Sequence, residues 1–177
     1  MSSPDLSYPI GRFAPPAATD AAARADFVAQ LAAAPDLLRR AVAGMDDERL
    51  DTPYRPGGWT VRQVVHHLPD SHLNAYVRFK LALTESEPLI RTYDEKLWAG
   101  LPEARTGPVE LSLDLLDALH RRWVAALRAL APDAFARTLR HPVLGPMTVD
   151  RLVALYAWHG RHHVAHITAL AGREGWR

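Results

Sequence analysis

The sequence contains no cysteine and almost no net charge, and both deficits exclude classes of function. Without cysteine the chain has no disulfide framework, no thiolate metal ligand and no cysteine nucleophile of its own. The 21 Lys and Arg residues nearly balance the 20 Asp and Glu residues, so the formal charge is +1. The basic residues are scattered rather than clustered, and we therefore expect no nucleic-acid partner.

Long apolar runs are also missing. No run approaches the roughly 18 residues of a membrane helix, and the first thirty residues lack the apolar core of a signal peptide. We therefore expect a cytoplasmic protein with no membrane partner. The 177 residues, 48% of them hydrophobic, suffice for a single globular domain over residues 1–177. The phosphate-cradling glycine loop and the G-x-S-x-G nucleophile elbow are absent as well.

Apolar residues recur at helical spacing in four long segments, which span approximately residues 20–42, 60–84, 112–130 and 148–171. Thr19 or Asp20 can cap the first helix. Pro35 either kinks that helix or starts a second one at its first turn. Four long helices without a convincing strand array predict an all-α four-helix bundle.

The segments between these helices carry further signals. Thr60 and Gln63 have the spacing of a capping box, and Gly172 suits the end of the last helix. Prolines make residues 1–18 an extended N-terminal arm, and residues 137–148 are typical of a short hairpin.

Two segments lack helical periodicity. Residues 45–58 are rich in proline and glycine and predict a loop. Residues 85–110 form the longest such stretch, and loops of this length in compact domains are often functional. We expect this loop to cover a site and to contribute Tyr93 and Trp98 to it.

Histidine is concentrated near the end of the chain, where four of the nine histidines lie within residues 156–166. On a helical wheel His159 and His163 form an i, i+4 pair on the apolar arc, His166 falls within that arc and His162 lies at its edge. Buried imidazoles require partners, which a shared metal ion supplies. The alternative is a set of core histidines that hydrogen-bond to their neighbours.

A third ligand is needed for an open metal site. On the helix over residues 60–84, His67 lies at the edge of the apolar arc, in line with Ser71, Asn74 and Arg78. Such a polar stripe suits the wall of a wet cavity, so His67 is the predicted third ligand. Asp70 either orients His67 or is a surface carboxylate.

The remaining histidines do not meet these criteria. His66 points away from the apolar arc, His72 lies inside it as a packed core residue, and His120 and His141 are isolated. Gly160 follows His159, so the H-E-x-x-H arrangement of zinc proteases and its glutamate base are absent.

Three stretches, Tyr8–Phe13, Arg55–Lys80 and Trp158–Ile167, make the sequence similar to the DinB/YfiT-like family, and to its YfiT branch in particular. The resemblance implies a DinB-like up-down-down-up bundle, a homodimer, and one zinc or nickel ion per chain bound by His67, His159 and His163. Pro69 departs from the family pattern, in which alanine is usual, and should kink the second helix.

The resemblance also implies two activities. In the first, a three-histidine site activates a low-molecular-weight thiol, bacillithiol, for attack on an electrophile. In the second, a metal-bound hydroxide hydrolyses amides or esters. The lack of a carboxylate base near the histidine pair favours thiol transfer, and a non-catalytic metal-binding stress-response module is a third alternative.

Several other side chains are candidates for the surroundings of such a site. Arg55, Arg78 or Arg161 could bind carboxylates of the thiol, although a solvated surface charge is the more common role of an arginine and the one favoured for each. The sequence identifies no catalytic residue. Further candidates for the second shell or the pocket are Asp70, Asn74, Arg78, His162 and His166.

Overall fold

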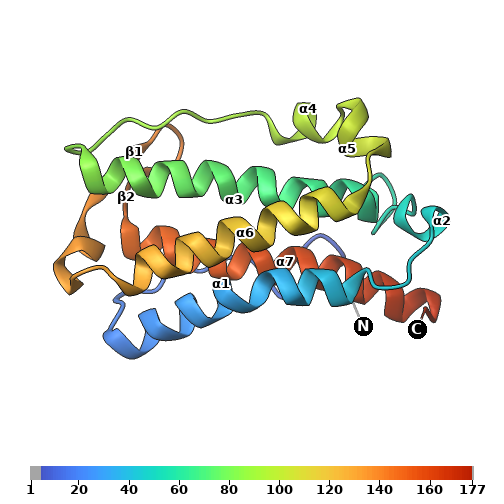
Figure 1. Ribbon diagram of the computed structural model, residues 1–177, viewed down its shortest axis with the longest axis horizontal. Helices are drawn as coiled ribbons and strands as arrows, with labels where there is room; N and C mark the ends of the chain where they lie inside the picture. Colours follow the sequence, from blue (N-terminus) through green and yellow to red (C-terminus); the bar gives the residue numbers. More distant parts are fainter. Residues whose placement is uncertain (1–4, 177) are drawn as a thin grey trace.

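The computed structural model describes residues 5–176, and it confirms the predicted all-α bundle (Figure 1). Residues 1–4 of the predicted arm lie outside the described residues, and residues 5–20 contain no helix or strand. The four long helices are α1 (Ala21–Ala41), α3 (Val61–Thr84), α6 (Val109–Arg128) and α7 (Val149–Glu174).

The direction of the long helices is up, down, down, up, as the colours of Figure 1 show. α1 and α7 run in one direction and contact each other, and α3 and α6 run in the other and contact each other. Because α3 and α6 are parallel, the chain must return along the bundle between them. The long segment after α3 makes this return, and it contains the short helices α4 (Glu95–Ala99) and α5 (Pro102–Thr106).

The other two connections are shorter. α1 and α3 are joined at one end through the short helix α2 (Asp47–Leu50), a helical turn that the predicted loop did not include. α6 and α7 are joined through the 3-10 turn η1 (Pro132–Ala136) and the hairpin of β1 (Thr138–His141) and β2 (Gly145–Thr148). The predicted hairpin is therefore confirmed.

The helix boundaries follow local signals. The Asp20 carboxylate accepts the Ala23 N–H at 2.8 Å, and α1 continues without a break through Pro35. α3 is likewise one helix across Pro69. α7 ends at Gly175, whose φ is +68°, and the predicted end at Gly172 is wrong because the last turn continues for three more residues.

Two clusters of buried apolar residues fill the bundle, and histidines lie between them. One cluster contains Phe79, Trp123 and Tyr156, and the other contains Leu38, Val65, Leu116 and Ile167. Along α3, α6 and α7, the histidines His72, His120 and His159 fall between the residues of the two clusters. The core thus has a polar layer across its middle.

α7 approaches α1 closely at this layer. A Cβ atom on Gly160 would lie 3.2 Å from the Ala34 Cβ and 3.7 Å from the His72 Cε1. Glycine at this position therefore permits the close packing of the two helices.

None of the helices within residues 5–176 is long and apolar enough to cross a membrane.

The capping box at the start of α3 confirms the predicted motif. The Thr60 hydroxyl accepts the Gln63 N–H at 3.2 Å, and the Gln63 side chain accepts the Thr60 N–H at 2.9 Å. We expect Thr60→Ala to lower the free energy of unfolding by about 1 kcal/mol because it leaves a helix N–H without this partner. Urea unfolding measures this change. Thr84→Ala, at the exposed end of the same helix, is the control, and equal losses in the two variants would contradict the assignment.

Candidate metal centre

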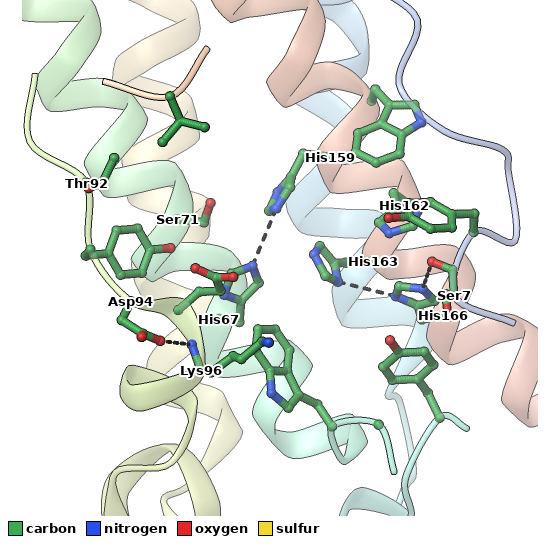
Figure 2. A pocket seen from close by; sticks show the side chains of 18 of the residues that line it. Ser7, His67, Ser71, Thr92, Asp94, Lys96, His159, His162, His163 and His166 are labelled. Atoms are coloured by element: carbon green, nitrogen blue, oxygen red, sulfur yellow. Dashed lines mark hydrogen bonds between the residues drawn. The ribbon is translucent and has the colours of Figure 1, made fainter. Parts of the chain in front are cut away.

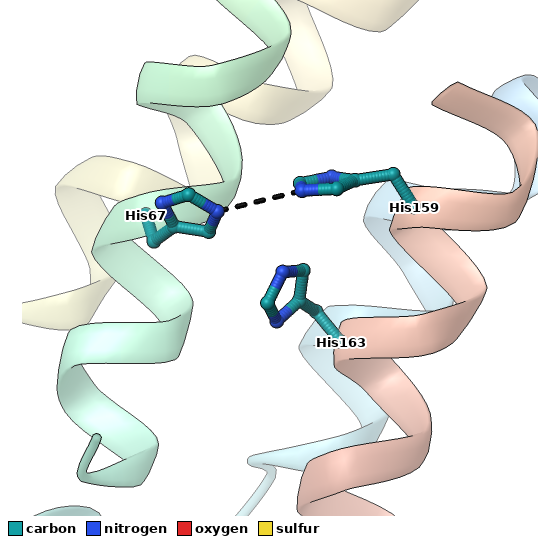
Figure 3. A group of neighbouring side chains, drawn as sticks. All are labelled: His67, His159 and His163. Carbon is teal, nitrogen blue, oxygen red and sulfur yellow. Dashed lines mark hydrogen bonds between the residues drawn. The ribbon is translucent and has the colours of Figure 1, made fainter. Parts of the chain in front are cut away.

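Three histidines from two helices meet inside the bundle (Figure 3). His67 of α3 and His159 and His163 of α7 each offer a ring nitrogen, and these atoms lie within 4.8 Å of one another. Within residues 5–176 this is the one group of three or more such ligands that meets so closely. The structure therefore brings together the three predicted ligands.

The distance between two of these nitrogens fits a tetrahedral ion. The Nε2 atoms of His67 and His159 are 3.4 Å apart. Two imidazoles that bind one tetrahedral ion, each at about 2.0–2.1 Å, place their nitrogens about 3.4 Å from each other. Imidazole ligands suit zinc and nickel, and three protein ligands leave a coordination position for a small molecule.

A chain of hydrogen bonds fixes the tautomer of His159. At its far end the Leu31 carbonyl is 2.6 Å from His120 Nδ1, and a carbonyl can only accept, so His120 carries its proton on Nδ1. His120 Nε2 then accepts from His72 Nδ1–H at 2.8 Å. His72 Nε2 in turn accepts from His159 Nδ1–H at 3.1 Å. The lone pair of His159 is therefore on Nε2, which faces His67.

A second, shorter chain fixes the tautomer of His163. The Ser7 carbonyl of the N-terminal arm accepts from His166 Nε2–H at 3.2 Å (Figure 2). His166 Nδ1 therefore accepts from His163 Nδ1–H at 3.4 Å. This arrangement leaves the lone pair of His163 on Nε2. Both ligands of α7 are thus held in the metal-binding tautomer by a histidine chain that ends on a backbone carbonyl.

Burial keeps the ligands neutral. Burial lowers the pKa of His67 to about 4, and it lowers the pKa values of His159 and His163 well below the ordinary value, with a further contribution from neighbouring imidazoles. Trp59 packs against His67, and Tyr54 stacks on His166 with ring centroids 4.0 Å apart. Neutral imidazole is the form that binds a metal ion, so protons compete weakly for this site at neutral pH.

The cluster opens into a cavity of about 1290 Å³ (Figure 2). His67, Ser71 and Arg78 line one wall, as expected for the polar stripe of α3. Residues 92–96 of the long connection form part of the lining, so the expectation that this loop covers a site is confirmed for Tyr93. Trp98 does not line the cavity; it packs on Tyr93 with ring centroids 4.5 Å apart.

Of the other candidates for the surroundings of the site, some line the cavity and others do not. His162 and His166 line the cavity, and His162 stacks on Trp158 with ring centroids 4.4 Å apart. Asp70 and Asn74 do not line it, and the Asn74 amide donates to the Asp70 carbonyl at 2.9 Å. Within the described residues Asp70 makes no hydrogen bond to His67. Burial and Glu103 raise the pKa of the Asp70 carboxyl to about 6.

The positions of two histidines differ from those that the sequence predicted. His66 is buried rather than turned outward, and its ring nitrogens lie 2.7 Å from the Ser112 hydroxyl and 3.2 Å from the Gly107 carbonyl. His120 is not isolated but forms the middle of the chain to His159. The apolar spacing of Leu116 and Trp123 around His120 was the available signal, because it places His120 on the buried face of its helix.

The chain through His120 provides a test of ligand orientation. We expect His120→Phe to weaken metal binding about 10- to 100-fold, because His72 Nδ1–H loses its acceptor and no longer fixes the ring of His159. His120→Gln should restore most of the affinity, since an amide can accept from His72 and donate to Leu31. Competition with a chelator measures the dissociation constant of Zn²⁺ or Ni²⁺. His66→Phe is the matched control, and an equal loss of affinity there would contradict the role of the chain.

The lowered histidine pKa values predict the pH dependence of stability in the metal-free protein. All nine histidines have a lowered pKa in the folded state. The unfolded chain takes up protons near pH 6.5, whereas the folded state resists them down to about pH 4 at His67 and His162. The contribution of the neutral histidines to the free energy of unfolding is therefore fully present above about pH 6.5 and is lost below it. The loss is about 1.4 kcal/mol per pH unit for each proton that the unfolded chain binds in excess of the folded chain. Urea unfolding between pH 7.5 and 5.5 measures this loss, and a flat profile would contradict it.

Comparison with known proteins identifies the family of this chain. Residues 30–167 match the DinB superfamily. A Bacillus subtilis protein named "Putative metal-dependent hydrolase YfiT" is 49% identical over 177 residues, which cover 99% of each chain. A Bacillus licheniformis protein that is also named a "putative metal-dependent hydrolase" is 52% identical over 172 residues, which cover 97% of this chain and 98% of the relative.

Solved structures extend the comparison to the fold. The structure of YfiT from Bacillus subtilis matches with a TM-score of 0.95 and 49% identity, and the match covers 98% of this chain and 99% of that one. The four-helix bundle protein TT2238 has a TM-score of 0.58 at 21% identity over 82% of this chain and 98% of that one, which is a likeness of fold alone. The sequence, the bundle and the histidine cluster agree with these relatives. The chain therefore belongs to the DinB superfamily, among the relatives of YfiT.

Proposed function

We propose that this protein is a metal-dependent enzyme that transfers a low-molecular-weight thiol, of the bacillithiol type, to a small electrophile. One zinc or nickel ion per chain would be held by the Nε2 atoms of His159 and His163 and by His67. The names of the relatives support metal dependence. The choice of thiol transfer is supported by the composition of the cavity next to the three histidines.

The observation that carries this choice is that, within residues 5–176, no carboxylate belongs to the histidine cluster or hydrogen-bonds to one of its three histidines. Among residues 5–176, the carboxylates that line the cavity are Asp94 and Glu95. The Asp94 carboxylate caps α4, where it accepts the N–H groups of Lys96 and Leu97 at 2.9 and 3.0 Å. A thiol has a pKa of about 8.5 and water one of about 15.7, so a thiol needs far less help to lose its proton.

When bound, the ion supplies a Lewis acid that lowers the pKa of the thiol further. The thiol proton then passes to solvent, the sulfur forms a bond to the electrophilic carbon, and the leaving group departs with the electrons of the broken bond. Trp59, which packs on His67, and Tyr8, which packs on His162, line the cavity beside the histidines and offer apolar surface to the reactants.

Hydrolysis of amides or esters is the second candidate. The names of the relatives favour it, and the open coordination position would accommodate water as well as a thiol. His162 also lines the cavity and could take a proton from water. A non-catalytic metal-binding module is the third candidate, and it would share the metal site but show no turnover.

Direct assays separate these candidates. The metal-loaded protein should conjugate bacillithiol to monochlorobimane faster than the metal-free protein and faster than His163→Ala, which removes a ligand. Conjugation at the background rate would contradict the transferase proposal. Metal-dependent cleavage of amides or esters from a panel of test substrates would then favour hydrolysis. His66→Phe serves as the control for the loss of a buried histidine. Elemental analysis of His163→Ala confirms that the lost activity accompanies lost metal.

The homodimer that the resemblance implies stays a prediction, as does the cytoplasmic location. Sedimentation at several protein concentrations measures the oligomeric state directly. A single species with the 19.6 kDa mass of one chain would contradict the dimer.

A further inference from the structure

Arg78 is a buried cation without an anionic partner. It lies on α3, its side chain lines the cavity, and only 9% of the residue is exposed. Its Nη2 donates to the Arg91 carbonyl at 3.0 Å, while its Nε is buried and has no partner in the part of the chain that the structure describes. Among the same residues, no carboxylate forms an ion pair with it.

The other buried arginine of α3 shows the usual arrangement. Arg62 is 5% exposed, and its guanidinium pairs with Asp47 at 2.6 Å and with Asp51 at 2.7 Å. Burying a charge costs free energy that an ion pair offsets. Arg62 has such compensation and Arg78 has none, so the position of Arg78 requires an explanation that the fold alone does not provide.

The groups around Arg78 are neutral hydrogen-bonding groups. Tyr156 and Tyr93 are neighbours of Ser71 and Arg78, which counteract part of the rise that burial causes in the pKa of each phenol. Burial raises the pKa of Tyr93 to about 12, so this phenol stays protonated and can donate. Ser71, Arg78 and Tyr93 all line the cavity. A guanidinium accompanied by hydroxyl donors is an arrangement that binds carboxylates and phosphates.

Arg78 and the metal centre lie on one face of the same helix. Arg78 follows His67 by eleven residues, with Ser71 between them on that face. Eleven residues rise about 16 Å along a helix, and the long Arg78 side chain, which leans towards the N-terminus of the helix, reduces the gap to on the order of 10 Å. A molecule that contacts both ends of this wall must therefore be elongated, with its anionic group far from its reacting group.

We propose that Arg78, with the hydroxyls of Ser71 and Tyr93, is an anion subsite that binds a carboxylate or phosphate on the far end of the substrate. The nature of the reacting group at the histidines rests on the proposed function. The anion subsite itself does not, since it follows from the unpaired guanidinium. The subsite indicates that the substrate is an elongated small molecule with a terminal oxyanion.

Chain length and terminal charge test the proposal in a binding experiment. Calorimetry of the Zn²⁺-loaded protein would compare 3-mercaptopropionate, 6-mercaptohexanoate and 6-mercaptohexanol. We expect the six-carbon acid to bind about tenfold more tightly than the alcohol of equal length and than the three-carbon acid, which cannot span the wall. In Arg78→Met the advantage of the acid over the alcohol should disappear, and Arg78→Lys should retain part of it. Adipate binding to the metal-free protein measures the subsite without metal binding, because a carboxylate can itself bind zinc.

Arg91→Met is the matched control, because Arg91 is exposed and contacts Arg78 only through its backbone carbonyl. Equal binding of the six-carbon acid and alcohol by the natural protein would overturn the proposal, as would an unchanged preference in Arg78→Met. Thermal unfolding without ligand separates a structural role. Arg78→Met should leave the melting temperature unchanged or raise it, and a marked decrease would assign Arg78 to holding the loop at Arg91. Because binding is measured without turnover, failure of thiol transfer would leave the result intact.

Discussion

The direction of hydrogen bonds in the histidine layer constrains the rest of the molecule. Two backbone carbonyls, of Leu31 and Ser7, can only accept hydrogen bonds, and from these ends the tautomers of the connected histidines follow one by one up to the candidate metal centre. The longer chain links α1, α6, α3 and α7. A shift of any one helix would leave a buried donor without an acceptor, which costs free energy. The fold and the orientation of the ligands are thus held by the same contacts.

The sequence predicted the bundle and the three histidines that meet inside it because both depend on helical periodicity. His159 and His163 share a face through their spacing alone, and the position of His67 beside an apolar arc indicated the wall of a cavity. The hydrogen-bond chains could not be predicted in this way, since they depend on distances between helices. His120 seemed isolated because its partners lie 48 and 89 residues away in the sequence. For the same reason the absence of a counterion at Arg78 emerges only when the neighbouring elements are in place.

The parallel arrangement of α3 and α6 has a consequence for the cavity. A chain that must return along the whole bundle passes over its surface, and here it contributes residues 92–96 to the cavity wall. The N-terminal arm contributes Ser7 and Tyr8 to the same cavity. Segments that connect or precede the helices therefore shape the space in which a substrate would lie, while the helices supply the ligands. Such a division would let the wall change in evolution without loss of the metal site.

The contact at Gly160 limits which catalytic groups can be added beside the histidine pair of α7. In a helix that binds zinc through H-E-x-x-H, the base is the residue directly after the first histidine. Here that residue faces α1, where a Cβ atom would already be 3.2 Å from Ala34 and 3.7 Å from His72. A glutamate at this position would point into the helix interface, away from the cavity, and would separate α7 from α1. A glutamate at Gly160 therefore cannot supply the general base of a zinc protease in this bundle. The obstacle is the packing of α7 against α1, not the arrangement of the histidines.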